Sequence, residues 1–334
     1  MGPDLGPVRA VDPSLNVIDG NELFGAFNRA RQAKDAAAIE STGEAMREML
    51  AEADVVCMMH PMMKEIVPLA PKMRWLHHTQ AGVSNLWSSD VWGAEQVTLT
   101  SGRGHVRPTA MAEYCVAAAM MFARGMYDGY IDKPSGKMDR SHYRSLRIEG
   151  ATMGIIGMGG IGGEVARLSK ALGMRVVATR NSVTVAQENA EGIDLLLPAA
   201  ELKRLAAESD FIAVCTQLTR ETLKLLDAGF FASTEKQPLL VNVSRGEVID
   251  EDAMIAALDQ GQIRGAVLDV FDGEMEGKAP REEFFTYPNV ILTPHVSTMG
   301  AVNDTGIIDL FCDNLRRFIK GEELLNVVDR ARGY

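Results

Sequence analysis

Gly157-Met158-Gly159-Gly160-Ile161-Gly162 lies at the centre of a strand–helix–strand pattern. An apolar run, Thr152–Ile156, comes before it, and a helical pattern and a second apolar run, Arg175–Thr179, come after it. A GxGxxG loop in such a unit is typical of dinucleotide binding, because glycine permits a tight turn, close approach to a pyrophosphate and close packing of the helix on the strand. The positive end of the helix dipole would face the same phosphates. The predicted cofactor contacts in this loop are Gly157, Gly159, Gly160, Ile161 and Gly162.

More apolar runs follow at regular intervals, with helical segments between most of them. They are Asp210–Cys215, Pro238–Val243, Gly265–Asp269 and Val290–Thr293. Nearly continuous apolar strands separated by helices indicate a parallel sheet that helices cover on both faces. The last part of the chain predicts one helix over Asp304–Lys320, which ends at Gly321.

The first hundred residues repeat this alternation on a smaller scale. A helix is expected near Ile39–Ala51, and short strands are expected at Leu15–Ile18, Asp54–Met59, Met73–Thr79 and Val97–Ser101. The fold class predicted is therefore α/β, with two Rossmann-like domains built on parallel sheets. Between them, Gly125–Arg147 is charged and lacks periodicity, so it is either a partner-binding arm or a loop.

The composition limits the classes of partner. The chain has 334 residues, a length that favours about two domains, and it carries 34 Lys+Arg against 45 Asp+Glu. A formal net charge of −11 without a basic cluster argues against binding to nucleic acid. The longest apolar stretch, Tyr114–Ala123, is too short for a membrane span, and the N-terminus has no signal-peptide pattern, so a cytoplasmic protein is expected. The four cysteines lie far apart, so neither a metal site nor a disulfide is predicted.

The residue at the end of the second strand bears on the choice of cofactor. An acidic residue there normally accepts hydrogen bonds from the adenosine ribose 2′-OH. Arg180 stands in its place, and no carboxylate appears before Glu188. A guanidinium suits a 2′-phosphate, so NADP(H) is predicted. The alternative is that Arg180 stacks on the adenine and that NAD(H) is used.

Three polar side chains follow the ends of three later strands. They are Arg245, Glu274 and His295, and parallel strands would bring them to one rim of the sheet. Reduction of a 2-keto acid by a dihydronicotinamide needs a cation for the carboxylate and a proton donor for the developing alkoxide. Arg245 can supply a bidentate fork, and His295 is the natural acid and base near neutrality. Glu274 beside it would keep the imidazole protonated.

Over nearly its whole length the sequence resembles the D-isomer-specific 2-hydroxyacid dehydrogenase family, in particular glyoxylate/hydroxypyruvate reductases. The matching stretches are Trp75–Val83, Gly154–Gly162, Asn242–Gly246, Leu268–Phe271, Pro288–His295 and Leu325–Val328. The resemblance implies that Arg245, Glu274 and His295 are the catalytic residues of the family. It also implies that the backbone amides of Ala81 and Gly82 hold the substrate carboxylate.

The resemblance extends to the cofactor site and the domains. It implies that Asp269 meets the nicotinamide carboxamide and that the loop at Cys215 faces the nicotinamide ribose; Val243, at another strand end, is a further expected cofactor contact. The family fold implies a dinucleotide-binding domain, residues 103–295, inserted into a discontinuous substrate domain, residues 1–102 and 296–334. A homodimer is expected on the same ground.

The substrate is less well defined than the reaction. No Arg opens the loop after His60, which argues against a phosphorylated substrate and leaves small acids such as glyoxylate, hydroxypyruvate or pyruvate, together with bulkier ones. His60, His77 and His78 either line the substrate pocket or belong to the core or surface. Two other functions stay open: a formate-dehydrogenase-like enzyme and a corepressor-like scaffold that senses a nucleotide.

Overall fold

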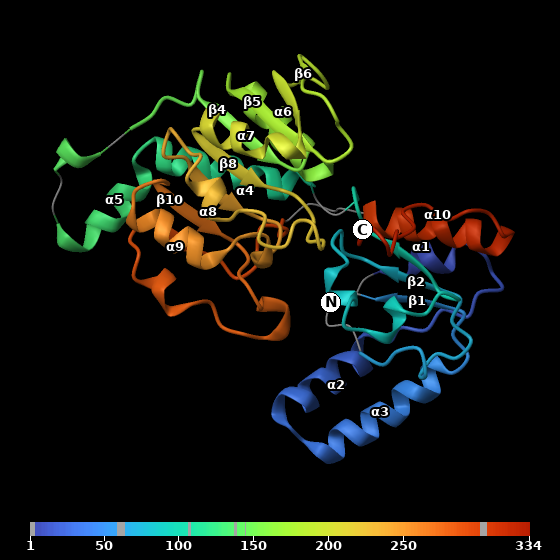
Figure 1. The fold of residues 1–334 in the computed structure, drawn as a ribbon. Coiled ribbons are helices and arrows are strands. Elements are labelled where there is room, and N and C mark those ends of the chain that lie inside the picture. The colour runs from blue at the N-terminus through green and yellow to red at the C-terminus, as the bar shows by residue number, and fades with distance from the viewer. Residues whose placement is uncertain (1–3, 59–63, 106–107, 137–138, 144, 301–305) are drawn as a thin grey trace. The chain divides into compact units, whose positions relative to one another are not determined.

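The computed structural model describes residues 4–58, 64–105, 108–136, 139–143, 145–300 and 306–334. The chain divides into two compact units (Figure 1). Unit 1 comprises Met1–Val106 and Asn303–Tyr334, and unit 2 comprises Arg107–Val302. The inserted domain predicted from the sequence, residues 103–295, begins and ends a few residues earlier than unit 2. Which unit binds cofactor and which binds substrate stays a prediction at this point.

Unit 2 is built on an eight-stranded sheet in the order β11-β10-β9-β8-β4-β5-β7-β6. Every pairing in it is parallel except that of β6 with β7. The strands are β4 (Thr152–Ile156), β5 (Arg175–Arg180), β6 (Gln187–Glu188), β7 (Leu195–Pro198), β8 (Phe211–Val214), β9 (Leu239–Asn242), β10 (Gly265–Leu268) and β11 (Val290–Leu292). Ile156 lies level with Thr179 on one side and Val214 on the other. The segments that follow these strands therefore leave the sheet at one edge.

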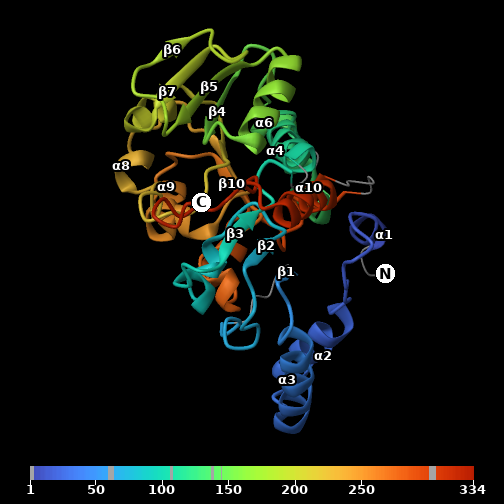
Figure 2. The same cartoon turned by 90° about the vertical axis from the view of Figure 1, so that its right-hand side faces the viewer.

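Helices cover both faces of this sheet, as the apolar strands predict. On one face, α4 (Pro108–Ala123) and α6 (Gly160–Ala171) share a core with the strands. On the other, the core includes α7 (Leu202–Glu208), α8 (Ala228–Phe231) and α9 (Glu251–Asp259), and Figure 2 shows the same layers from the side. Because both faces are covered, β4, β8 and β9 are buried along their whole length. The predicted parallel α/β class is confirmed.

Two parts of unit 2 were not predicted. The apolar β7 and the two-residue β6 extend the sheet beyond β5. The charged excursion contains a helix, α5 (Met126–Asp132), and two short turns of 3₁₀ helix, η3 (Lys133–Ser135) and η4 (Arg140–His142).

Unit 1 has a smaller parallel sheet, β1-β2-β3, formed by β1 (Val55–Met58), β2 (Trp75–His78) and β3 (Thr98–Ser101). One face packs on α10 (Gly306–Lys320), where the Trp75 ring stacks on Phe311 with 5.2 Å between the ring centroids. The other face packs against a core that includes η1 (Ser84–Leu86) and η2 (Asp90–Trp92). The helices α2 (Asn21–Ala33) and α3 (Ala36–Leu50) lie side by side as a hairpin, preceded by α1 (Gly6–Arg9) (Figures 1 and 2).

The strand predicted at Leu15–Ile18 is wrong. These residues belong to no strand, although Leu15 and Val17 pack against the same core as Trp75 while Ile18 is 57% exposed. The alternating apolar side chains pack against the core here without the backbone pairing of a strand. The helix α2 just after it was not predicted either. The first two residues of the expected C-terminal helix, 304 and 305, lie outside the described residues.

Candidate active site

The glycine loop joins β4 to α6 and shows why glycine is needed at two of its positions. Gly157 has a φ of 98°, and a Cβ there would lie 2.8 Å from the backbone of Thr216. A Cβ on Gly162 would lie 2.1 Å from the carbonyl oxygen of Gly157. A Cβ on Gly159 would meet nothing within 4 Å, so this position faces open space. The loop is therefore tightly packed against the protein and open where α6 begins, which fits a bound pyrophosphate.

Arg180 ends β5 and folds back on the glycine loop. Its Nε and Nη2 both donate to the carbonyl oxygen of Met158, at 3.0 and 2.7 Å. Its Nη1 forms an ion pair with Glu191, a residue that the sequence analysis did not single out. Arg180 is thus at the predicted end of the cofactor site, and its contact with a 2′-phosphate stays a prediction.

Arg245 is held by a turn after β9. The Asn242 side chain accepts a hydrogen bond from the backbone N–H of Ser244 and donates one to the carbonyl oxygen of Arg245. Gly246 follows because a Cβ there would lie 1.9 Å from the carbonyl carbon of Phe271, on the loop after β10. The backbone after β9 therefore approaches the backbone after β10 as closely as glycine allows.

The guanidinium of Arg245 is poorly paired for a half-buried cation. Its Nη1 donates to the carbonyl oxygen of Ser244 at 2.7 Å, and its buried Nε has no hydrogen-bond partner within the part of the chain that the structure describes. Burial lowers the pKa of Arg245, while the charges of Glu247 and Glu274 act to raise it. A half-buried cation whose Nε lacks a hydrogen bond is suited to an incoming carboxylate.

His295 and Glu274 are in direct contact. The Nδ1 atom of His295 lies 2.8 Å from Oε1 of Glu274, and the two side chains are 26% and 21% exposed. Because Nδ1 is engaged by the carboxylate, Nε2 is the nitrogen left to exchange a proton with a ligand. His295 has a φ of 53°, an uncommon backbone conformation for a residue with a side chain.

Asp269 holds the turn that carries His295. Its carboxylate is fully buried and accepts hydrogen bonds from the Thr293 hydroxyl and from the backbone N–H groups of Val296 and Ser297, at 2.6, 2.8 and 2.9 Å. The Tyr114 hydroxyl, 2.6 Å from that of Thr293, extends the network, and burial raises the pKa of Tyr114 to about 12. Asp269 thus anchors both sides of the strained His295 backbone. Its predicted contact with the nicotinamide stays a prediction.

Arg245, Glu274 and His295 follow β9, β10 and β11, which are neighbours in the sheet. The structure therefore brings the predicted catalytic residues to one edge of unit 2. Of the other predicted cofactor contacts, Cys215 is half-buried after β8, and Val243 is only 2% exposed after β9. Ala81 and Gly82 follow β2 in unit 1, where both are half-buried, and their binding to a carboxylate stays a prediction.

His77 and His78 belong to the core of unit 1, whereas His105 is exposed. His77 and His78 are fully buried in β2, and Nδ1 of His77 lies 2.8 Å from the Thr100 hydroxyl. Burial lowers the pKa of His77 to about 4. His60 lies outside the described residues. Within the described ranges, no three His, Cys, Asp or Glu side chains form a group that could hold a metal ion, and no helix has both the length and the apolarity of a membrane span.

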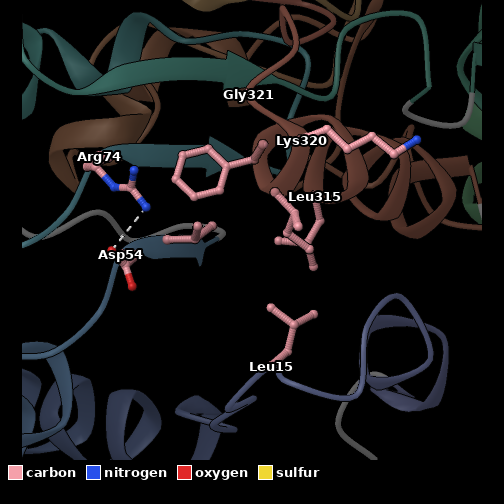
Figure 3. A pocket seen from close by; sticks show the side chains of 9 residues that line it. Leu15, Asp54, Arg74, Leu315, Lys320 and Gly321 are labelled. Carbon is pink, nitrogen blue, oxygen red and sulfur yellow. Dashed lines mark hydrogen bonds and ion pairs between the residues drawn. The ribbon is translucent and has the colours of Figure 1, made fainter.

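A cavity of about 500 Å³ lies elsewhere in unit 1, and Figure 3 shows it. Its walls come from the start of β1 and β2 and the end of α10, with an ion pair of 3.3 Å between Arg74 and Asp54. It contains none of the predicted site residues. It also lies at the amino ends of the strands, whereas ligands of open α/β sheets bind beyond the carboxyl ends.

Comparison with known proteins identifies the family. Residues 116–297, which lie within unit 2, match the model of the D-isomer specific 2-hydroxyacid dehydrogenase NAD binding domain. The chain is 31% identical to a glyoxylate reductase of Pyrococcus horikoshii over 277 residues, covering 80% of this chain and 79% of that protein. It is 32% identical to a D-3-phosphoglycerate dehydrogenase of Synechocystis over 253 residues, covering 75% of this chain but 43% of that protein. The match to a D-3-phosphoglycerate dehydrogenase of Methanocaldococcus jannaschii covers 54% of that protein. The chain thus spans about half the length of these two relatives.

A solved structure agrees with these matches. An NADPH-dependent glyoxylate/hydroxypyruvate reductase from Sinorhizobium meliloti, in complex with NADP and sulfate, is 26% identical to this chain with a TM-score of 0.73. The similarity covers 84% of this chain and 86% of that one.

The fold and the match over residues 116–297 define unit 2 as an NAD binding domain of the 2-hydroxyacid dehydrogenase type. The chain belongs to the D-isomer-specific 2-hydroxyacid dehydrogenase family. The family and the fold class predicted from the sequence are confirmed.

Proposed function

We propose that this chain reduces a small 2-keto acid to a D-2-hydroxy acid with NADPH. The observation that carries the proposal is the 2.8 Å contact between His295 and Glu274 at the same sheet edge as the half-buried, poorly paired Arg245. The glycine loop follows β4, which is two strands from β9 in the sheet. This loop fits the cofactor phosphates, because Gly159 faces open space at the start of α6. When bound, the reduced nicotinamide supplies the hydride.

The protein's own groups perform three tasks in this reaction. Arg245 binds and orients the keto acid through its guanidinium, whose fork matches a carboxylate. His295 donates a proton from Nε2 to the carbonyl oxygen as negative charge develops there. Glu274 keeps its hydrogen bond to Nδ1 throughout, so the imidazole is held in one orientation while Nε2 gives up its proton.

A panel of acids tests this function. Glyoxylate, hydroxypyruvate, pyruvate, phosphohydroxypyruvate and formate are each assayed, the keto acids with NADPH and NADH and formate with the oxidised cofactors. We expect reduction of small keto acids, since the match to a glyoxylate reductase spans 79% of that enzyme. Preferred turnover of the phosphorylated acid would overturn the substrate class. Oxidation of formate would favour the formate-dehydrogenase-like alternative, and cofactor binding without any turnover would favour the corepressor-like one.

NADP(H) is the proposed cofactor because Arg180 stands where a 2′-phosphate would lie. Three similar structures are complexes with NADP or NADPH. In an Arg180→Asp variant the ratio of kcat/KM for NADPH to that for NADH should fall at least about tenfold, because an attractive charge becomes a repulsive one. Steady-state kinetics with both cofactors measures this ratio. An unchanged ratio would contradict the assignment of Arg180 to the 2′-phosphate.

A homodimer is part of the proposal, and α5 offers the surface for it. Met126, Tyr130 and Ile131 on this helix are 65%, 68% and 42% exposed, a concentration of apolar side chains typical of an interface. A variant with Met126→Asp and Tyr130→Asp should be monomeric by light scattering at concentrations where the unmodified chain is dimeric. Phe285→Asp, at a residue that is also 68% exposed, is the matched control and should leave the dimer intact.

We also propose a cytoplasmic location. Cys57, Cys115, Cys215 and Cys312 are free thiols, which suits a reducing compartment. Cell fractionation tests the location, and recovery of the enzyme in a secreted or membrane fraction would contradict it.

A further inference from the structure

The ion pair between Arg180 and Glu191 joins the cofactor site to the turn between β6 and β7. Arg180 is the last residue of β5, and its Nη1 contacts Oε1 of Glu191. The two side chains are 31% and 45% exposed, so a ligand can reach the pair from solvent. The carboxylate of Glu191 therefore contacts the same guanidinium that, under the proposed function, binds the 2′-phosphate of NADPH.

The backbone fixes the place of Glu191. Asn189, Glu191 and Gly192 have φ angles of 51°, 53° and 78°, so three of four consecutive residues adopt the left-handed conformation of a tight turn. The backbone N–H of Asn189 donates to the carbonyl oxygen of Asp194, and the Asp194 carboxylate in turn accepts from the backbone N–H of Val176 at 2.8 Å. The turn is thus tied to the sheet beside β5.

The donors of Arg180 can be counted. A guanidinium side chain has five N–H groups. Nε and one N–H of Nη2 are used on the carbonyl oxygen of Met158, and one N–H of Nη1 is used on Glu191. One N–H on each terminal nitrogen remains for a ligand. A 2′-phosphate that takes them would place its negative charge beside the Glu191 carboxylate, whereas a ribose 2′-OH could donate to that carboxylate without repulsion.

We propose that Glu191 is a specificity-determining residue that weakens the preference for NADPH which Arg180 confers. The inference rests on the proposed function, because it assumes that this site binds the adenosine end of the cofactor. Glu191 competes with the 2′-phosphate for the guanidinium and accepts a hydrogen bond from the 2′-OH of NADH. The ratio of the affinity for NADPH to that for NADH should therefore be smaller than it would be with Arg180 and no carboxylate at position 191.

Binding measurements on the full chain test the proposal without turnover. In Glu191→Gln, which keeps the length of the side chain, the affinities for NADPH and for 2′,5′-ADP should rise about threefold to tenfold by calorimetry. Those for NADH and 5′-AMP should stay level or fall. Glu191→Asn gives a second variant, because asparagine tolerates the left-handed conformation well. An unchanged NADPH/NADH affinity ratio in both variants would overturn the proposal.

Glu188→Gln is the matched control. Glu188 is an exposed glutamate of β6 on the same hairpin, and removing its charge should change the ratio less than twofold. Equal effects of Glu188→Gln and Glu191→Gln would overturn the proposal in favour of a general charge effect. In an Arg180→Gln background, Glu191→Gln should favour NADPH less than it does when Arg180 is present, because the competition for the guanidinium is then absent. Failure of the unmodified chain to bind either cofactor would instead overturn the proposed function.

Discussion

In a His295→Gln variant, kcat for keto-acid reduction falls about 10²-fold to 10⁴-fold, while the cofactor still binds. The loss has this size because glutamine fills a similar space but cannot donate a proton to the developing alkoxide. Cofactor binding should survive because the glycine loop follows β4, whereas His295 follows β11 at the end of the sheet. Steady-state kinetics measures the first effect, and titration with NADPH measures the second.

Glu274→Gln provides the companion measurement. Glutamine can still accept a hydrogen bond from Nδ1 but holds the imidazole less firmly than a carboxylate does, so kcat should fall, though less than in His295→Gln. Turnover near normal in His295→Gln would remove His295 from the mechanism. Equal values of kcat for Glu274→Gln and the unmodified chain would remove the role assigned to Glu274.

Arg245→Lys should raise KM for the keto acid roughly tenfold to a hundredfold, since lysine keeps the positive charge but loses the planar fork that matches a carboxylate. Lysine has fewer N–H donors than arginine, so the substrate carboxylate would have fewer hydrogen-bond partners. The poor access of water to this position adds to the effect, because water could not replace the lost partners. The KM for NADPH should change little. Kinetics at varied keto acid and saturating cofactor measure the effect.

Arg204→Lys serves as the control for this substitution. Arg204 lies on the surface of α7, where it pairs with Glu201 and Glu208, and its replacement should leave KM unchanged. Should Arg245→Lys lower kcat and leave KM as it was, Arg245 would act only in the transition state. Unchanged values of both would show that another group holds the carboxylate.

The parts of unit 2 that could be predicted are those that a short stretch of chain determines. The bounds of β4, β8 and β9 agree with the predicted apolar runs to within one residue, because strands buried on both faces need apolar side chains throughout. The contact between His295 and Glu274 could be predicted because both residues follow strands that lie side by side. The pairing of β10 with β11 therefore brings together two residues that are far apart in the sequence.

The contacts that were missed depend on backbone conformation instead. Glu191 reaches Arg180 only because its turn is left-handed, and non-glycine residues adopt that conformation too rarely to be recognised from sequence. The anchoring of His295 by Asp269 involves backbone N–H groups, which every residue except proline carries, so no pattern of side chains indicates it. In unit 1, Leu15 and Val17 have the alternation of a strand without the backbone pairing of one.

The end of the large sheet at β6 bears on how unit 2 behaves at high concentration. A long, flat strand at the edge of a sheet can take up strands from other molecules and start fibrils. β6 has two residues, runs opposite to its neighbour, and exposes both Gln187 and Glu188. An edge strand that is so short and carries a charge offers few free backbone groups to an incoming strand. This edge of unit 2 is therefore protected from amyloid-like growth.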